Sequence, residues 1–139
     1  MAFFIGVVHR KQILAARAAG IVAFSHGRES AVRNIAAGDR VIYYAPRTDL
    51  DGDPVQAFVA HATVKGKAPY QKDWGTGFTG WARDADFDSV TETPIRPMLE
   101  TLDFIPNPKN WGMAMRNGKF EIGADDYARI AGAMLGDAT

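Results

Sequence analysis

The chain of 139 residues contains no cysteine, carries no net charge and has no apolar run long enough to cross a membrane. Without cysteine there is no disulfide framework, no thiolate metal site and no cysteine nucleophile. Basic and acidic residues number 16 each, so composition alone gives no support to nonspecific coating of nucleic acid. With 47% hydrophobic residues, the chain is typical of a globular protein. We expect it to be cytoplasmic.

The N-terminal apolar run, from Ala2 to Val8, is short. It has seven residues and no basic residue before it. A spanning helix needs about 20 apolar residues, and a signal peptide places basic residues ahead of its apolar core. We therefore expect neither a membrane span nor a signal peptide, and we interpret the run as a strand buried on both faces. The length predicts a single domain over residues 1–139.

Motifs of known catalytic and cofactor sites fail in their context. The run 75–80 matches G-x-G-x-x-G, but neither an apolar strand before it nor an apolar-periodic helix after it is present. Asp49, Asp51 and Asp53 lack the following glycine and the twelfth-position acid of a calcium loop, so they predict a turn. The three histidines have no zinc-site spacing, and G-x-S-x-G is absent. The sequence predicts no metal, no cofactor and no catalytic residue.

Hydrophobic periodicity and turn residues predict a mixture of strands and short helices. Asn117-Gly118 between apolar alternations predicts a hairpin over Met113 to Ile122, and 65–80 is typical of a loop. Several short strands with few helices indicate an α+β domain built on a curved sheet or barrel. The expected strands are 2–8, 21–24, 40–45, 55–64 and 81–90, and the expected helices are 11–19, 29–37, a short turn or helix in 94–102 and a terminal helix that contains Asp125 in its first turn.

The neutral total conceals a basic first third. Residues 1–47 contain seven Lys and Arg against two acids, a balance of +5, and residues 48–139 carry the compensating −5. These basic side chains would attract phosphate if the fold gathers them on one face, and would otherwise be a solvated surface. The side chains that we expect to contact phosphate are Lys11, Arg28, Arg33 and Arg47.

Aromatic and polar residues near strand ends and in loops are the remaining functional pattern. Ser25-His26-Gly27-Arg28 offers a hydroxyl, an imidazole and a guanidinium, Tyr43-Tyr44 ends a strand, and the three tryptophans lie in Gly-, Asp- or Asn-rich segments. Such rings either pack in a core or sandwich a flat heterocycle whose edge is read by polar groups. Because neighbouring strand residues face opposite sides, only one of Tyr43 and Tyr44 is expected to line a given pocket.

A set of short motifs runs in order through nearly the whole chain. They are His26-Gly27-Arg28, Gly38 to Arg47, Gln56-Ala57-Phe58, Pro69-Tyr70, Trp81-Ala82-Arg83, Pro94 to Pro97, and Asn110-Trp111-Gly112 with Arg116 downstream. This set resembles the EVE domain family, also labelled UPF0310. Phe3-Phe4 departs from the usual tryptophan-containing start, Arg28 replaces a lysine, and Ala45 replaces a serine. A role of that serine hydroxyl in relatives does not carry over.

The resemblance implies a PUA-like fold, a curved β-barrel with flanking short helices, related to the YTH readers of methylated adenine in RNA. It implies a free-standing, non-enzymatic reader of a modified nucleobase in DNA or RNA, with an aromatic-lined pocket and a basic rim. For Trp111, packing against the terminal helix is an equal alternative. The ligand-binding residues that it implies are Val8, His9, Phe24, Ser25, His26, Tyr43, Tyr44, Trp81 and Trp111.

Two other functions stay open. Some PUA-like relatives of the ASCH type hydrolyse modified cytidine, and here His26 would need Asp39 or Asp73 within hydrogen-bonding reach to act as a base. The other is a protein-interaction module whose pocket binds no base. Turnover of a modified nucleoside would identify the first, and an occupied aromatic pocket would speak against the second.

Overall fold

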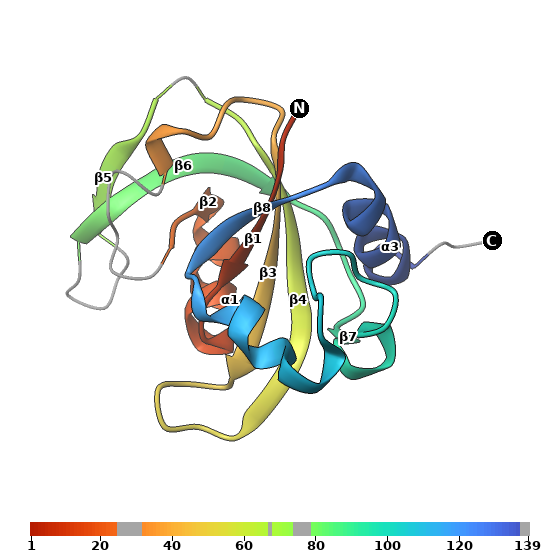
Figure 1. Ribbon diagram of the computed structural model, residues 1–139. Helices are drawn as coiled ribbons and strands as arrows, with labels where there is room; N and C mark the ends of the chain where they lie inside the picture. Colours follow the sequence, from red (N-terminus) through yellow and green to blue (C-terminus); the bar gives the residue numbers. More distant parts are fainter. Residues whose placement is uncertain (25–31, 67, 74–78, 137–139) are drawn as a thin grey trace.

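The computed structural model describes residues 1–24, 32–66, 68–73 and 79–136 (Figure 1). A mixed sheet in the order β2-β6-β4-β3-β1-β8 curls into a half-barrel, with β5 paired to β6 and β7 paired to β4. The strands are β1 (Phe3–Val7), β2 (Ile21–Val22), β3 (Arg40–Arg47), β4 (Pro54–Val64), β5 (Tyr70–Asp73), β6 (Thr79–Phe87), β7 (Thr93–Pro94) and β8 (Lys119–Ile122). The helices are α1 (Arg10–Ala19) and α3 (Ala124–Met134), with 3₁₀ helices η2 (Arg96–Met98) and η3 (Pro108–Arg116).

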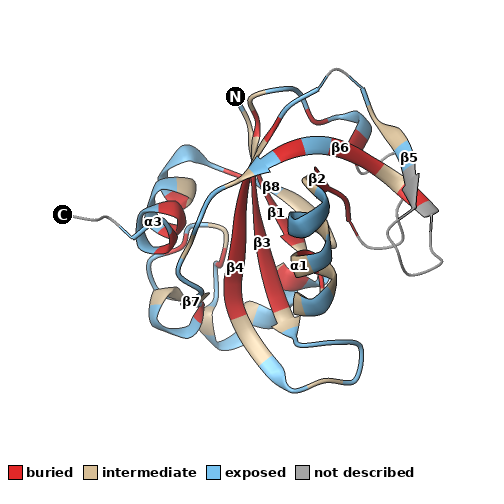
Figure 2. Cartoon of the chain, turned by 180° about the vertical axis from the view of Figure 1, so that it is seen from behind, coloured by how far each residue is buried: buried red, intermediate tan, exposed pale blue. Residues whose placement is uncertain are grey.

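The apolar first run forms β1, as predicted, and lies inside the sheet. It pairs in parallel with β3 and antiparallel with β8. Phe4 and Ile5, on opposite faces of β1, are buried in two different cores, which explains why its sequence is apolar without alternation. Strands β3 and β4 are likewise buried along most of their length (Figure 2).

The sheet separates two cores, and each is covered by a helix. On one side, which we call the α1 face, Ile13 of α1 packs with Phe4 and Tyr43. On the other, the α3 face, Ile130 of α3 packs with Ile5. Successive residues of a strand therefore contribute to different cores.

The two longer helices agree with their sequence signals. α1 ends at Gly20, which adopts the left-handed conformation with φ of 71° and closes the helix through its amide. In α3, Asp125 and Asp126 occupy the first turn, where the helix dipole favours acids. Ile130 and Met134 are its buried stripe.

The hairpin predicted over 113–122 is wrong. Pro108–Arg116 is a 3₁₀ helix that begins after Asn107, whose side chain accepts a hydrogen bond from the amide of Lys109. Pro108 at its first position suits a helix start. The strand that follows, β8, pairs with β1 instead of folding back on 113–116. The local preference of Asn117-Gly118 for a hairpin turn is therefore outweighed by pairing with β1, which lies far away in the sequence.

Two further expectations need correction. Residues 65–80 are not simply a loop, because Tyr70–Asp73 forms β5 and pairs with β6, which begins at Thr79. Of the helix predicted over 29–37, residues 29–31 lie outside the described residues, and the chain is helical only at Val32 and Arg33. The amide of Ala36 is instead bound by the carboxylate of Asp39.

Candidate nucleic-acid interface

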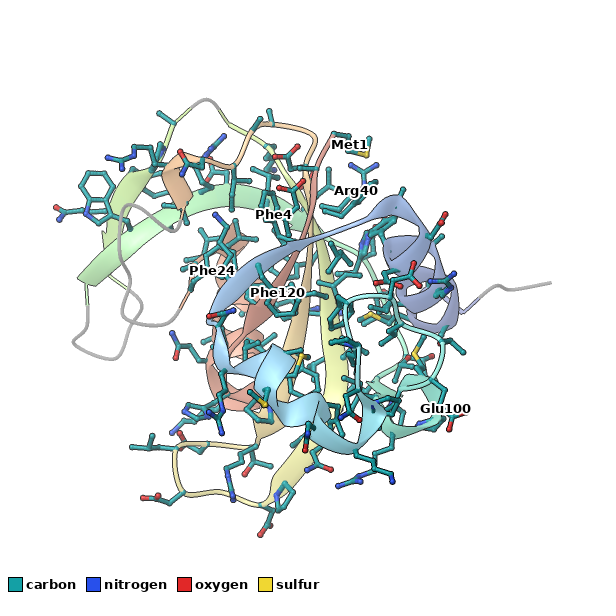
Figure 3. The ribbon with its side chains drawn as sticks, viewed as in Figure 1. Met1, Phe4, Phe24, Arg40, Glu100 and Phe120 are labelled. Carbon is teal, nitrogen blue, oxygen red and sulfur yellow. The ribbon has the colours of Figure 1, made fainter. Side chains whose placement is uncertain are left out.

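Four aromatic side chains from four segments belong to the core on the α1 face. Phe4 comes from β1, Phe24 follows β2, Tyr43 lies on β3, and the partly buried Trp81 of β6 packs against the same core. The ring centroids of Phe24 and Tyr43 are 5.9 Å apart. Phe4 and Phe24 both lie below the arch of β6 in Figure 3. We call these four residues the aromatic cluster.

The absence of a side chain at Gly6 lets the rings of Phe24 and Tyr43 approach the backbone of β1. A Cβ atom on Gly6 would meet the Phe24 ring at 2.7 Å and the Tyr43 ring at 2.8 Å. The Tyr43 hydroxyl is fully buried and bonds both backbone groups of Ala23. Burial raises the pKa of Tyr43 well above its usual range. The phenol therefore remains a neutral, fixed support for the cluster.

Lys119 completes this side of the sheet, and sequence reasoning missed it. It faces Gly6 across the β1–β8 pair. Its ammonium lies 4.8 Å from the centroid of the Phe4 ring and 5.7 Å from that of Phe24. Burial lowers the pKa of Lys119. The predicted hairpin gave Lys119 a different position, because only the pairing of β8 with β1 brings Lys119 over these rings.

Val8 belongs to the same core as the aromatic cluster. His9, the next residue, lies at the N-cap of α1, and its buried Nδ1 has no hydrogen-bond partner within the described residues. Ser25, His26 and Arg28, which the sequence also nominated, lie outside the described residues, as does Trp74.

Tyr44 and Trp111 lie on the other side of the sheet. Tyr44 packs in the α3-face core, with the Trp111 ring edge-on at a centroid distance of 6.4 Å. The alternation expected for Tyr43 and Tyr44 is confirmed. A single pocket cannot therefore be walled by Phe24 and Trp111 together.

The three predicted phosphate contacts that the structure describes, Lys11, Arg33 and Arg47, are not gathered in one place. The ammonium of Lys11 lies 3.6 Å from the Asp49 carboxylate, in the hairpin between β3 and β4. Arg47, at the end of β3, donates to the carbonyl of Gly52 in the same hairpin. Arg33 belongs to the segment that precedes Arg40, the other end of β3, and Arg28 is outside the described residues.

Arg83, from the Trp81-Ala82-Arg83 motif, is a structural cation. It is 3% exposed and lies on β6. Its guanidinium donates to the carbonyls of Val32, Ile35 and Gly66. These bonds attach the segment before β3 to the arch formed by β6.

The cavity beneath α1 is small. It has a volume of about 20 Å³ and is lined by Val8, Ile13, Ala23 and Tyr43 among others. That is room for one water molecule and far too little for a nucleobase. A second hollow of about 520 Å³, beside the end of α1, is wide open and polar, and Arg17 and Lys65 there are balanced by Asp84 and Asp86.

The acid–base pair considered for a hydrolase has no support in the described residues. Both oxygens of Asp39 are occupied, because they accept hydrogen bonds from the amides of Ala2 and Ala36, each over 2.9 Å. His26 and the side chain of Asp73 lie outside the description. Within the described residues no group of three or more potential metal ligands is found, and no helix is long and apolar enough to cross a membrane.

A carboxylate–imidazole–phenol chain does exist on the α3 face. His61 is buried on β4, and its Nδ1 lies 2.7 Å from Asp88 while its Nε2 lies 2.8 Å from the hydroxyl of Tyr127. No local motif indicates this chain of contacts, because His61 and Tyr127 are 66 residues apart. The chain joins β4 to α3, and Tyr127 also stacks on Phe3.

Comparison with known proteins agrees with this architecture. The EVE domain profile matches residues 2–133. The UPF0310 protein msl3206 of Mesorhizobium japonicum is 40% identical over 136 residues, covering 96% of this chain and 91% of its own. A UPF0310 protein of Mycobacterium avium is 36% identical over 135 residues, covering 96% and 98%.

Two solved structures share the fold at low sequence identity. Protein Atu2648 from Agrobacterium tumefaciens has a TM-score of 0.57 and 12% identity, covering 98% of this chain and 96% of its own. Rpa0253 from Rhodopseudomonas palustris has a TM-score of 0.55 and 16% identity, covering 94% and 90%. The curled mixed sheet with flanking helices confirms the PUA-like α+β fold that the sequence resemblance implied. Within that class, the chain belongs to the EVE domain family, or UPF0310.

Proposed function

We propose that this protein is a non-enzymatic reader, acting in the cytoplasm, that binds a modified nucleobase of DNA or RNA beside the aromatic cluster. The observation that carries the proposal is the position of Lys119. Its half-buried ammonium lies over the rings of Phe4 and Phe24, at the margin of the cluster. A flat base needs an aromatic surface on which to stack and a donor that bonds its edge. Phe4, Phe24 and Tyr43 are buried, so in this proposal the partly exposed Trp81 offers the stacking surface and Lys119 the donor.

The energetics of such a site favour an unpaired base. Stacking of a base on an aromatic side chain contributes about 1–3 kcal/mol. Taking a base out of a duplex costs a few kcal/mol and costs least in a single strand. The lowered pKa of Lys119 reflects partial removal from water, and a hydrogen bond from a desolvated ammonium to a carbonyl or hydroxyl of the base is stronger than one in solvent. Lys119 thus supplies selectivity for an acceptor group.

In this proposal the strand carrying the base is held by cations, among them Lys11, Arg28, Arg33 and Arg47. Because these contacts release counterions from the strand, affinity for an oligonucleotide falls as salt rises. Affinity for the free nucleoside depends much less on salt. The salt dependence therefore separates strand contacts from base contacts.

The test is a thermal-shift panel of modified adenine and cytosine nucleosides, free and within oligonucleotides, at two salt concentrations. One modified base at a hundredfold excess over its Kd is expected to stabilise the protein by about 2.7 kcal/mol. Trp81→Ala and Lys119→Met should each remove that shift. Lys65→Met is the matched control, because Lys65 is an exposed lysine of the polar hollow beside α1.

Two results would count against the proposal. Unchanged affinity in both Trp81→Ala and Lys119→Met, with the fold intact, would exclude the aromatic cluster as the base site. The nucleoside should also be chemically unchanged when it is analysed by chromatography after incubation with the protein. A hydrolysed product would assign the protein to the hydrolases instead.

A further inference from the structure

A second group of side chains capable of contacting a nucleotide lies on the α3 face. It consists of Tyr44, Gln56, Arg96 and Trp111, which we call the Arg96 cluster. We infer that the Arg96 cluster binds a nucleotide that neighbours the recognised base, so that the strand crosses the β8 edge of the sheet. The inference rests on the proposed function and extends it from a base to a strand.

Gln56 holds the cluster together through an unusual backbone conformation. Its φ is 51°, the left-handed region that a glutamine rarely adopts. The register between β3 and β4 shifts there, because Ala45 pairs with Ala57 while Arg47 pairs with Pro54. The bulge turns the Gln56 carbonyl toward the amide of Ile95, at 3.0 Å. Strained bulges of this kind are often found beside functional sites.

The same glutamine orients the guanidinium of Arg96. Its Oε1 accepts a hydrogen bond from Nε of Arg96 over 3.0 Å. The guanidinium carbon of Arg96 lies 5.5 Å from the centroid of the Trp111 ring. An arginine held by its Nε against an indole keeps its two terminal nitrogens available and presents a flat surface.

Arg96 also has no acidic partner within the described residues. Arg10 is paired with Glu92, and Arg129 is paired with Asp103 and Asp126. Arg96 is exposed, and its polar partner in the structure is the neutral Gln56. Its charge is therefore not neutralised and remains available to a phosphate.

Tyr44 provides an unused hydrogen-bonding group beside Trp111. Its side chain is 1% exposed, and no hydrogen bond of its hydroxyl is found within the described residues. The hydroxyl oxygen is not among the fully buried atoms without a partner, so it keeps some contact with solvent, and a ligand atom can replace the water there. Burial raises the pKa of Tyr44 to about 12, so the hydroxyl is protonated at neutral pH and able to donate.

The Arg96 cluster and the aromatic cluster are close along the sheet. Gly6 aligns with both Lys119 and Tyr43, and the next residue, Val7, aligns with Tyr44. The strands β3, β1 and β8 are consecutive, and adjacent strands are about 4.8 Å apart, so Tyr44 and β8 are separated by about 10 Å. β8 is the last strand in the sheet order. A single strand can therefore pass around this edge from one cluster to the other.

The chemistry of the cluster favours a nucleotide over an acidic protein segment. Glutamate and aspartate side chains would pair with the guanidinium but would leave the stacked arginine–indole surface unused. A nucleotide uses both, because its phosphate bonds the terminal nitrogens while its base stacks on the guanidinium plane or the indole.

The test compares wild-type protein, Arg96→Ala and Arg96→Lys by fluorescence anisotropy. The probes are an unmodified single-stranded oligonucleotide, the same strand with the modified base selected by the nucleoside panel, and that free nucleoside. Arg17→Ala is the control, because Arg17 is also an exposed arginine and lies at the far end of α1, in the polar hollow away from the Arg96 cluster.

Arg96→Ala should weaken binding of both oligonucleotides about tenfold and lower the slope of log affinity against log salt by about one. Arg96→Lys should lie between Arg96→Ala and wild type, since it keeps the charge and loses the flat fork. The affinity for the free nucleoside should differ by less than about twofold among all variants. Arg17→Ala should bind the oligonucleotides with the affinity of wild type.

Each other outcome has a definite meaning. If the nucleoside binds but Arg96→Ala leaves the affinity for the strand unchanged, the role of the Arg96 cluster is refuted and the proposed recognition of a modified base is retained. If strands bind through Arg96 without preference for any modification, recognition of a modified base is refuted and the strand contact at Arg96 is retained. Binding of polyglutamate that needs Arg96, with strand affinity unaffected, would assign the cluster to an acidic protein and overturn the inference. Absence of all binding overturns both.

Discussion

The hydroxyl of Tyr43 donates a hydrogen bond to the carbonyl of Ala23 over 2.6 Å and accepts one from the amide of the same residue over 2.9 Å. One phenol thus satisfies both backbone groups of the residue before Phe24. Since all of these atoms are buried, no solvent replaces the phenol if it is removed. Tyr43 thereby sets the position from which Phe24 reaches Gly6 and Lys119.

Tyr43→Phe should lower the free energy of unfolding by about 1–3 kcal/mol, because it leaves the Ala23 amide and carbonyl without partners. Urea denaturation measures the loss. Tyr70→Phe is the control, since the Tyr70 hydroxyl bonds the exposed Asp84 and its removal should cost less than about 1 kcal/mol. Equal costs for the two variants would contradict the role assigned to Tyr43.

Gly6→Ala should destabilise the protein by about 1–3 kcal/mol, because the added methyl group collides with two buried rings. It should also weaken ligand binding by displacing Phe24. Gly132→Ala is the opposite case. Its Cβ would meet nothing within 4 Å in the middle of α3, so it should raise stability by up to about 1 kcal/mol. Thermal denaturation of both variants measures these effects. Shifts of the melting temperature in the same direction for Gly6→Ala and Gly132→Ala would contradict the packing argument.

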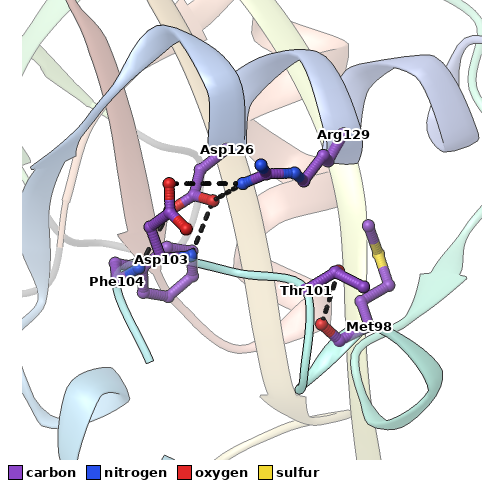
Figure 4. A network of polar contacts seen from close by, with 6 residues as sticks. All are labelled: Met98, Thr101, Asp103, Phe104, Asp126 and Arg129. Atoms are coloured by element: carbon purple, nitrogen blue, oxygen red, sulfur yellow. Dashed lines mark hydrogen bonds and ion pairs between the residues drawn. The ribbon is translucent and has the colours of Figure 1, made fainter. Parts of the chain in front are cut away.

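Asp126→Asn should cost about 2–3 kcal/mol. The buried carboxylate of Asp126 accepts hydrogen bonds from the amides of Asp103 and Phe104 and pairs with Arg129 at 2.7 Å (Figure 4). The substitution removes its charge and replaces an acceptor by a donor. The neighbouring Asp125 is exposed, and Asp125→Asn should lose only the helix-dipole contribution, under about 1 kcal/mol. Unfolding of the two variants in guanidinium chloride measures both losses of free energy. A smaller loss for Asp126→Asn than for Asp125→Asn would contradict the role assigned to Asp126.

Alkaline pH should destabilise the fold partly through Tyr44. Burial raises the pKa of Tyr44 from 10.0 to about 12. Between these values the folded state keeps the phenolic proton that the unfolded chain has lost, so stability falls as pH rises. At about pH 11 the loss is about 1.4 kcal/mol. The unfolding free energy of Tyr44→Phe, followed over the same interval, should fall less steeply than that of wild type, and parallel curves would exclude this contribution.

The elements with strong local signals were predictable from the sequence. The helical stripe of α3 and the apolar run of β1 were confirmed. Strand alternation alone placed Tyr43 and Tyr44 on different faces. These features depend on residues within one turn of helix or one strand, so a local pattern contains the necessary information.

The long-range features could not be predicted in this way. Asn117-Gly118 is a strong hairpin signal, yet β8 pairs with β1, and Ile122 aligns with Phe3. β5 is a largely polar strand and has no apolar alternation to reveal it. The positions of Lys119, Arg96 and the chain from Asp88 through His61 to Tyr127 follow from these pairings. Only the register of the sheet brings them together.

The pairing of β1 has a consequence for how the protein is made. β1 is synthesised before both of its neighbours in the sheet, which are β3 and the much later β8. Until residue 122 has been synthesised, one edge of this apolar strand has no partner, and such an edge invites association with other chains. Completion of the sheet therefore waits for the synthesis of β8. Fragments that end before β8 should accumulate as aggregates, while a chain that contains β8 covers this edge itself.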